Sequence, residues 1–434
     1  MASLDRLSLW EKEVSTAFAH LSRPQLRGLI LWSAGRALTG SAGICQISAL
    51  LALVLNQGEQ AVFQLLREWY LDGKQKSGKQ RQEVEVSACF APLLRWIVRL
   101  WDSTENRLPL VVDATSLGNR WTVLAVSVVL KGGAIPVAWK VLRAEQEGSW
   151  RPHWEKLFAD LTGAIPSDWF VIVLADRGLY ARWMWDAICA CGWHPFLRIN
   201  LGVKASLAEH NDFDWLSRWV PTPGTHWKGV VDCFAGKTSR LRATLLMHWE
   251  PGYESAWAIV TDLDPTQAEV SWYRLRTWIE GGFKDFKRGL WGWQQSKMLH
   301  ESGVERLWLA MALAQLWCLS VGADGEQQEQ ALLPVEERLP ETHVALRKRQ
   351  RGLASQSPRR LSCVLRGRLH LLALTLLAQL LVVGRLVPDS WPAAIVPPQK
   401  HLAPALRHGT KTPRDKERRR RQKQRAYERS KALS

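Results

Sequence analysis

Apolar and polar positions divide the chain into a helical start, a β-rich centre and a helical end. Over residues 1–100, apolar side chains recur at helical spacing in 26–31, 47–55 and 62–69. This spacing predicts a helical N-terminal region. The polar stretch 72–83 interrupts the pattern and is expected to form a linker or loop.

The centre consists of short apolar runs rich in β-branched residues. Three predicted strands come in sequence, and two more alternate with helices. The strands are 108–112, 121–130, 134–142, 169–175 and 195–199, and the helices are 154–161 and 182–190. Lys131, Gly132 and Gly133 predict a hairpin between the second and third strands. This order predicts an α/β fold with a mixed five-stranded sheet of the RNase H kind and flanking helices.

The segments after residue 200 do not continue this alternation of strands and helices. Three β-like runs between Gly/Pro-rich turns predict a β-rich insertion over 201–265. A helical pattern then returns and ends at a mostly polar connector, 322–342. Two strongly apolar segments, 307–321 and 369–383, are about 15 residues long. A membrane span needs roughly 20 residues, so we expect two buried helices and no membrane partner.

The stretch 272–287 carries the most informative pattern. Read as one helix, it places Tyr273, Arg276, Glu280 and Lys287 within about 60° of one another. An apolar stripe lies beside them: Trp272, Leu275, Ile279, Phe283 and Phe286. An amphipathic surface helix with a solvated charged face gives the same pattern. A lone carboxylate among cations also suits a metal ligand beside a bound phosphate.

Two aspartates, Asp113 and Asp176, each follow an apolar β-run. Turn chemistry explains most acids in such positions. In the predicted sheet, however, the ends of the first and fourth strands are neighbours, and a helix bearing Glu280 could complete a pocket of three carboxylates. Three carboxylates without His or Cys favour Mg²⁺ or Mn²⁺. Two such ions about 4 Å apart can activate a water or hydroxyl and stabilise the leaving oxygen of a phosphodiester.

The charge of the chain points to a polyanionic partner. The formal net charge is +17, and residues 407–434 hold 12 Lys/Arg against 3 Asp/Glu. We expect a disordered basic tail over 399–434, which either binds phosphates or is only a solvated end. The stretch 347–368 holds eight Lys/Arg and no acid, and it fits a phosphate-facing surface and a solubilising surface equally well.

The cysteines indicate a reducing compartment. None of the seven shows paired C-x-x-C spacing, so we expect buried, unpaired thiols, with zinc binding as the weaker alternative. The N-terminus lacks the apolar core of a signal peptide. These features predict a cytoplasmic protein, associated with the nucleoid when it is bound to DNA.

The spacing Y-x2-R-x3-E-x6-K at Tyr273, Arg276, Glu280 and Lys287 resembles the YREK signature of the insertion-sequence-four family of DDE transposases. The resemblance extends over about 105–322. It includes V-V-D-A-T, V-L-A-D-R-G, the β insertion and R-L-W-L-A-M-A-L-A after the signature.

The resemblance implies an RNase H-like core and a catalytic, metal-binding triad of Asp113, Asp176 and Glu280. Such an enzyme binds the ends of a mobile element as a homodimer on double-stranded DNA. It cleaves the DNA with two Mg²⁺ ions, for which Mn²⁺ may substitute, and transfers the 3′-hydroxyl ends into target DNA.

The same resemblance implies that Tyr273, Arg276 and Lys287 contact DNA phosphates. Members of the family often excise the element through a DNA hairpin and stack an extruded base on a tryptophan of the insertion. Trp257 is the best match for that residue, with core packing as the alternative because the chain holds 25 tryptophans.

The resulting domain division has six parts. They are a helical, DNA-end-binding region (1–100), the first part of the catalytic core (101–200), the β-rich insertion (201–265), the remainder of the core with the YREK helix (266–322), a helical C-terminal region (323–398) and the basic tail (399–434).

Two other functions remain open from the sequence. One is a structure-specific nuclease with the same two-metal core, and the other is a transposase-derived DNA-binding protein that no longer cuts. The intact triad argues against the second, and the YREK signature argues against a generic nuclease. Inverted repeats and a short target duplication in the flanking DNA would favour the transposase.

Removing residues 407–434 should weaken DNA binding uniformly across sequences, because phosphate contacts carry no sequence information. The slope of log affinity against log salt concentration should also become smaller. Titrating labelled duplexes at several salt concentrations measures both. An unchanged slope would show that the tail is only a solvated end.

Overall fold

The structure is a computed structural model that describes residues 5–76, 82–208, 210, 212–236, 239–334 and 361–394. The basic tail 399–434 and most of the basic stretch 347–368 lie outside the described residues.

The N-terminal region is helical, as its apolar spacing predicts. Its helices are α1 (Ser8–Ala17), α2 (Arg23–Thr39), α3 (Ile44–Leu55), α4 (Glu59–Tyr70) and α5 (Phe90–Arg99). Helix α2 begins with a capping box, in which Gln25 accepts a hydrogen bond from the backbone N–H of Ser22 at 2.9 Å. It ends at Gly40, whose φ of 64° favours glycine.

The centre of the chain forms a ten-stranded sheet in the order β3-β2-β1-β4-β5-β10-β9-β8-β6-β7. The strands are β1 (Arg107–Leu117), β2 (Trp121–Leu130), β3 (Gly133–Arg143), β4 (Phe170–Ala175), β5 (His194–Arg198), β6 (Lys204–Leu207), β7 (Asp214–Trp215), β8 (His226–Cys233), β9 (Leu241–His248) and β10 (Trp257–Thr261). Strands β1, β4 and β5 are parallel, and the other pairs are antiparallel.

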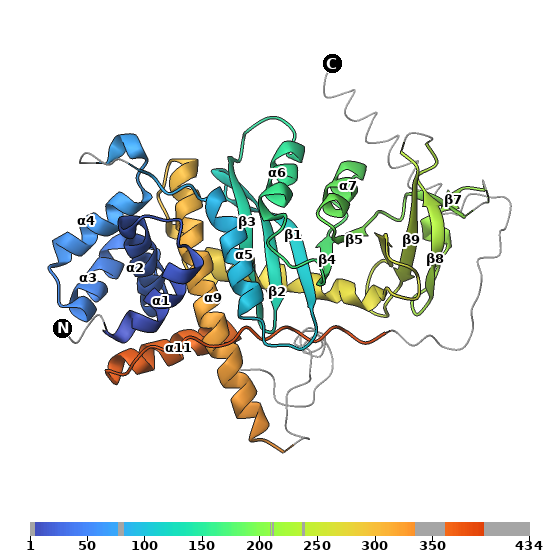
Figure 1. Cartoon of the computed structure of the whole chain (residues 1–434). Helices are drawn as coiled ribbons and strands as arrows, with labels where there is room; N and C mark the ends of the chain where they lie inside the picture. Colours follow the sequence, from blue (N-terminus) through green and yellow to red (C-terminus); the bar gives the residue numbers. More distant parts are fainter. Residues whose placement is uncertain are drawn as a thin grey trace. The chain divides into compact units, whose positions relative to one another are not determined.

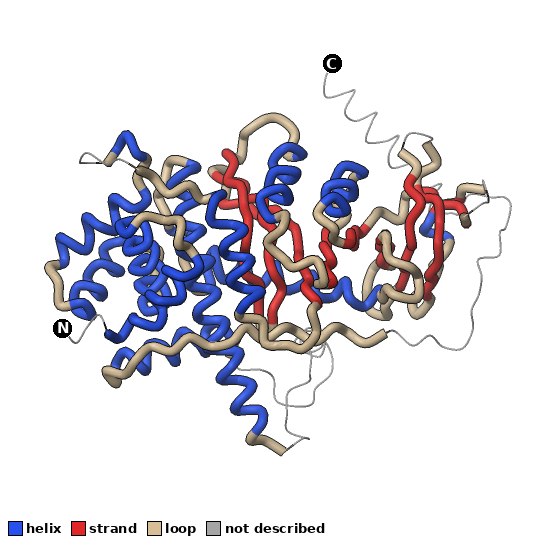
Figure 2. Tube along the Cα trace, in the orientation of Figure 1, coloured by secondary structure: helices blue, strands red, loops and turns tan. Residues whose placement is uncertain are grey.

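The mixed α/β class is confirmed, but the prediction of a sheet limited to five strands is wrong. Strands β1 to β5 are all present, yet β10 pairs with β5 through Ile259 and Arg198. The strands of the insertion therefore continue the central sheet. Figure 2 draws all strands in red. An open edge strand exposes unpaired backbone groups, and alternation along a sequence does not reveal which strand will cover them.

Helices cover the five central strands, whose residues are mostly buried on both faces. They include α6 (Arg151–Leu161), α7 (Arg182–Ala190), α8 (Thr277–Lys284) and α9 (Glu301–Ala331). Helix α9 packs against β3 on one side and α2 and α4 on the other, so it joins the N-terminal helices to the sheet (Figure 1).

Helix α9 confirms the buried helix predicted at 307–321 but continues to Ala331, so the prediction that the polar connector begins at 322 is wrong. Gly322 allows the facing helix α11 (Cys363–Leu376) to lie close to this part of α9, because a Cβ there would lie 1.8 Å from the carbonyl oxygen of Cys363. Close packing therefore holds α9 and α11 together, although the end of α9 is mostly polar.

Among the described residues, α9 has the length and apolarity of a membrane span, and the bent pair of α2 and α3 passes the same test if it is taken as one segment. In α9, however, 94% of the apolar window is buried inside the protein. This burial is that of a core helix, because its apolar side chains are already covered by α2, α11 and β3.

The C-terminal segment corrects another expectation. The predicted buried helix at 369–383 ends at Leu376, which is exposed, and Ala378 has a φ of 57° that breaks the helix. The residues after it, 381–394, form an irregular, extended segment that we call the C-terminal strap. Its residue Leu386 exchanges backbone hydrogen bonds with Leu100 (3.0 Å) and Asp102 (2.9 Å).

The thiols are less uniformly buried than expected. None of the seven cysteines, all of them among the described residues, forms a disulfide. Cys89, Cys233, Cys318 and Cys363 are buried, whereas Cys45 is exposed, and Cys189 and Cys191 are half-buried. Helix ends and surfaces tolerate a small side chain as readily as the core does, so the prediction that all are buried is wrong for three.

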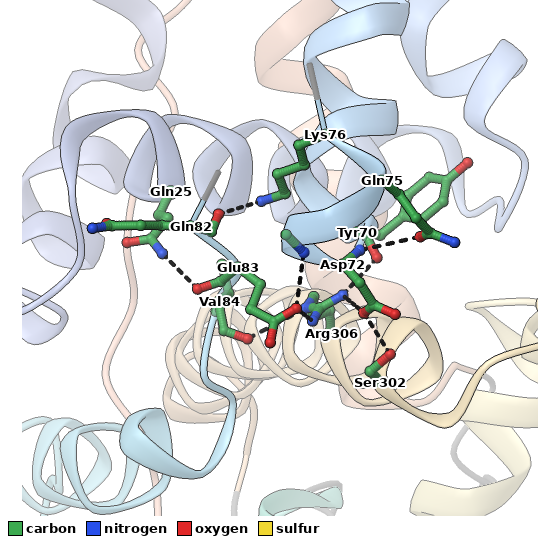
Figure 3. A network of polar contacts seen from close by, with 11 residues as sticks. Gln25, Tyr70, Asp72, Gln75, Lys76, Gln82, Glu83, Val84, Ser302 and Arg306 are labelled. Atoms are coloured by element: carbon green, nitrogen blue, oxygen red, sulfur yellow. Dashed lines mark hydrogen bonds and ion pairs between the residues drawn. The ribbon is translucent and has the colours of Figure 1, made fainter. Parts of the chain in front are cut away.

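Arg306 on α9 links the predicted linker to the core (Figure 3). Its guanidinium donates to the carbonyl of Tyr70 (2.8 Å), to Asp72 (2.9 Å), to Glu83 (3.1 Å) and to the carbonyl of Val84 (3.3 Å). The arginine is only 2% exposed. Both ends of the stretch 72–83 are thus held by one buried cation.

Replacing Arg306 by Met should lower the free energy of unfolding by about 1–3 kcal/mol, because the carbonyls of Tyr70 and Val84 lose a donor, whereas Asp72 and Glu83 are partly exposed to water. Urea denaturation followed by circular dichroism measures this loss. Arg143→Met is the matched control, since Arg143 pairs with Glu301 of the same helix at the surface, and it should have little effect. Equal losses in both variants would contradict the role of Arg306.

Candidate active site

The register of β1 and β4 brings two of the predicted carboxylates together. The parallel pairing ends at Val112 opposite Ala175, and Asp113 and Asp176 are the next residues along the two strands. The predicted neighbourhood of the two aspartates is therefore confirmed. The prediction that the first strand ends at Asp113 is wrong, because β1 stays paired with β2 beyond Asp113, which faces Ala125.

One guanidinium joins all three predicted carboxylates. Nη2 of Arg276 lies 2.8 Å from Oδ2 of Asp113 and 3.5 Å from Oδ2 of Asp176. Nη1 of the same residue lies 3.4 Å from Oε1 of Glu280. The Arg276 side chain is 12% exposed, whereas that of Glu280 is 65% exposed. A cation thus occupies the centre of the carboxylate group.

The stretch that carries Arg276 and Glu280 is not the single regular helix predicted at 272–287. It consists of a 3₁₀ helix, η5 (Val270–Arg276), the α-helix α8, and a π-helical turn, η6 (Asp285–Gly289). Helical periodicity in a sequence does not distinguish these three windings. Short 3₁₀ and π segments are frequent at functional sites.

Contacts with the sheet and the strap hold this stretch in place. A Cβ at Gly282 would lie 3.2 Å from the carbonyl oxygen of Ala134, so glycine allows α8 to approach β3 closely. On the strap, Asp389 accepts a hydrogen bond from the indole of Trp278 at 2.7 Å. The hydroxyl of Ser271 donates to a strap carbonyl at 3.0 Å. The strap therefore positions both η5 and α8.

Tyr273 and Arg198 complete the surroundings of Asp176. The Tyr273 hydroxyl donates to Oδ1 of Asp176 at 3.3 Å, and Nη1 of Arg198 lies 3.6 Å from the same oxygen. Sequence reasoning missed Arg198. A signal was available, because Arg198 ends the strand that pairs in parallel with the one preceding Asp176.

Lys287 does not join this group. It lies in the π-helical turn, and among the described residues no hydrogen bond or ion pair connects it to the three carboxylates. Burial and the neighbouring Arg288 lower the pKa of Lys287. A π turn has more residues per turn than an α-helix, so side chains after it point in other directions than α-helical spacing predicts. This explains why Lys287 does not continue the predicted row of Tyr273, Arg276 and Glu280.

Trp257 lies next to the site and is buried. Its ring centroid is 5.4 Å from that of Tyr273 and 5.9 Å from that of Tyr253, both in edge-on contact. It is 8% exposed. This packing accounts for the tryptophan as a core residue, and its base-stacking role stays a prediction.

The two aspartates experience opposite electrostatic effects. Burial raises the pKa of Asp113, and Arg276 offsets this only in part. Burial also acts to raise the pKa of Asp176, but its partners outweigh burial and hold the pKa below its ordinary value. In order of effect, these partners are Arg276, the backbone N–H of Arg177, Arg198 and Tyr273.

The donor set fits a hard cation. Three carboxylates supply oxygens only, which is the chemistry of Mg²⁺ and Mn²⁺ sites. In the described residues, no three His, Cys, Asp or Glu side chains are spaced around a single ion position; the guanidinium of Arg276 lies among the carboxylates instead.

Asp113 and Asp176 should affect stability with opposite signs. The ordinary pKa is 3.8. Because the pKa of Asp113 is raised, its ionisation destabilises the folded protein as the pH rises above 3.8. Because the pKa of Asp176 is lowered, its carboxylate stabilises the fold above pH 3.8, and this contribution is lost as the pH falls below it.

We therefore expect Asp113→Asn to raise the melting temperature at pH 7 and Asp176→Asn to lower it. Scanning calorimetry at pH 7 and pH 3 measures both variants against the wild type, and the difference between the variants should shrink at pH 3. Shifts of the same sign at pH 7 would contradict the opposite environments of the two carboxylates.

No family model matches this chain, and no curated protein matches it. The chemistry of the site is therefore inferred from the positions of Asp113, Asp176, Arg276 and Glu280.

Proposed function

We propose that this protein is a DDE transposase that binds the ends of an insertion sequence, cleaves DNA and transfers the 3′-hydroxyl ends into target DNA. One observation carries the proposal. Asp113, Asp176 and Glu280 come from distant parts of the sequence and converge on a single guanidinium beside a parallel strand pair. A set of carboxylate oxygens suits the divalent ions of two-metal phosphodiester chemistry.

The sheet order supports the same proposal. Strands β3, β2 and β1 are antiparallel neighbours, and β4 and β5 follow in parallel. This order agrees with the RNase H-like core that the resemblance to DDE transposases implies. Strands β6 to β10 lie between Asp176 and Glu280 in the sequence, where the resembling transposases carry their β insertion.

In the proposed reaction, Asp113, Asp176 and Glu280 would hold two Mg²⁺ ions, or Mn²⁺ in their place. Such ions would supply the activation of an attacking water or hydroxyl and the stabilisation of the leaving oxygen. Tyr273 orients Asp176 through its hydroxyl, and Arg198 helps to keep that carboxylate ionised.

The remaining predicted residues serve DNA binding in this proposal. Tyr273, Arg276 and Lys287 would contact the DNA backbone, for which arginine and lysine are the usual partners. Tyr273 and Arg276 would then exchange their present contacts with the carboxylates for phosphate oxygens. Trp257 is the candidate for stacking an extruded base, which would require its ring to leave the contacts with Tyr253 and Tyr273. The partners are double-stranded DNA at the element ends and target, and a second copy of the chain that holds the other end.

Glu280→Gln should lower Mg²⁺-dependent cleavage of DNA carrying the element ends by at least about 100-fold, since even outer partners of metal ligands are worth 10–100-fold. Binding of the same DNA should be retained. A gel that resolves nicked, hairpin and strand-transfer products measures the first effect, and a mobility shift measures the second.

Glu301→Gln is the matched control, because Glu301 pairs with Arg143 at the surface of α9 and should leave cleavage unchanged. Undiminished cleavage by Glu280→Gln would refute the triad. Cleavage by the wild type without any strand-transfer product would favour the nuclease over the transposase.

A further inference from the structure

Arg276 occupies the position where the proposed function requires divalent cations. Its two terminal nitrogens lie 2.8, 3.5 and 3.4 Å from oxygens of Asp113, Asp176 and Glu280. A Mg²⁺ ion binds carboxylate oxygens at 2.0–2.1 Å. An ion bound to the same oxygens would therefore lie against the guanidinium, and the two cations would repel each other at close range.

The conflict cannot be relieved by loss of a proton. Burial by itself lowers the pKa of Arg276, but Tyr273 and the three carboxylates outweigh burial and raise the pKa above its ordinary value. The guanidinium therefore stays charged at any physiological pH. It has to move before a metal can bind.

The position of Arg276 in the backbone favours such a movement. Arg276 is the last residue of the 3₁₀ helix η5, and α8 begins at the next residue. A change between 3₁₀ and α winding at this junction would redirect the side chain, and 3₁₀ stretches often mark hinges. Nε of Arg276 is buried and has no hydrogen-bond partner among the described residues, so the present position leaves one donor unsatisfied.

A phosphate group is the partner that can compete for this side chain. It offers several anionic oxygens, and a guanidinium binds two of them in parallel. The Glu280 side chain is 65% exposed, so a phosphate in solvent can reach the three carboxylates from the side of α8. Asp176 would keep its contacts with Arg198 and Tyr273 after Arg276 leaves.

We propose that Arg276 is an exchangeable internal counter-ion: it pairs with the three carboxylates and offsets part of their charge in the DNA-free protein, and it must transfer to a phosphate before a divalent cation binds. This inference rests on the proposed function for the identity of the phosphate as that of DNA. It makes metal binding dependent on DNA, so that the carboxylates hold metal only when a substrate is present. By linkage, the metal must tighten phosphate binding by the same factor.

Mn²⁺ binding to the full-length protein tests this exchange without any measurement of activity. Electron paramagnetic resonance of free Mn²⁺ gives the dissociation constant in buffer alone, with inorganic phosphate and with a short duplex DNA. Duplex DNA should tighten Mn²⁺ binding by about tenfold, which corresponds to a coupling of about 1.4 kcal/mol. A gain with inorganic phosphate as well means that any phosphate suffices, and a gain with duplex alone means that the phosphate must be held by a DNA backbone.

Arg276→Gln should bind Mn²⁺ at least about tenfold more tightly than the wild type in the absence of DNA, and DNA should then give no further gain. Arg274→Gln is the matched control. Arg274 lies on the same 3₁₀ helix but pairs with Glu250 at 3.2 Å, so its loss should leave Mn²⁺ binding unchanged. Melting temperatures give a second readout, because Mn²⁺ should stabilise Arg276→Gln more than it stabilises the wild type.

Mn²⁺ binding to Arg276→Gln that is no tighter than to the wild type would overturn the exchange, as would wild-type binding that is indifferent to duplex DNA. The proposed function fails by a different result. If Arg276→Gln gains Mn²⁺ affinity but the wild type cleaves no element-end DNA, the counter-ion exchange stands and the transposase assignment falls.

Discussion

The parallel pairing of β1 with β4 is the constraint on which the rest of the site depends. Its register places Asp113 and Asp176 side by side at the end of a strand pair that is buried on both faces. Two like charges at such a place repel each other and lose hydration. The guanidinium of Arg276, from a third element, offsets this repulsion. The helical stretch that carries Arg276 therefore has to lie across this end of the sheet.

That helix is held from two sides by parts of the chain far from it in sequence. Gly282 allows α8 to lie close to β3, and the strap binds Trp278 through Asp389. Trp391 of the strap packs edge-on against Trp272 at 4.8 Å, and the guanidinium of Arg107 lies 4.0 Å from the Trp391 ring. The C-terminal segment thus fixes the starts of β1 and η5 relative to each other, and with them the distance between Asp113 and Arg276.

Sequence patterns predicted the elements of this fold better than their partners. The apolar runs located β1 to β5, and the spacing of Asp113, Asp176 and Glu280 picked out residues that converge in space. The pairing of β10 with β5 could not be predicted, because alternation does not specify a neighbour. The position of Arg276 between the three carboxylates could not be predicted either. Its helical spacing from Glu280 does not indicate that it also contacts Asp113 and Asp176. Winding changes at Arg276 and Asp285 leave no trace in a 3.6-residue periodicity.

The three carboxylates differ in how firmly neighbouring residues hold them: the two aspartates are fixed, and Glu280 is not. Asp113 lies within a paired strand, and Asp176 is fixed by Arg198, Tyr273 and its own turn. Glu280 is exposed and shares its short helix with the junction at Arg276. In the proposed exchange, a change of winding at Arg276 would release the guanidinium while the two aspartates stay in place. The sheet would then supply a fixed pair of ligands, and the irregular helix would be the part of the site that responds to a bound phosphate.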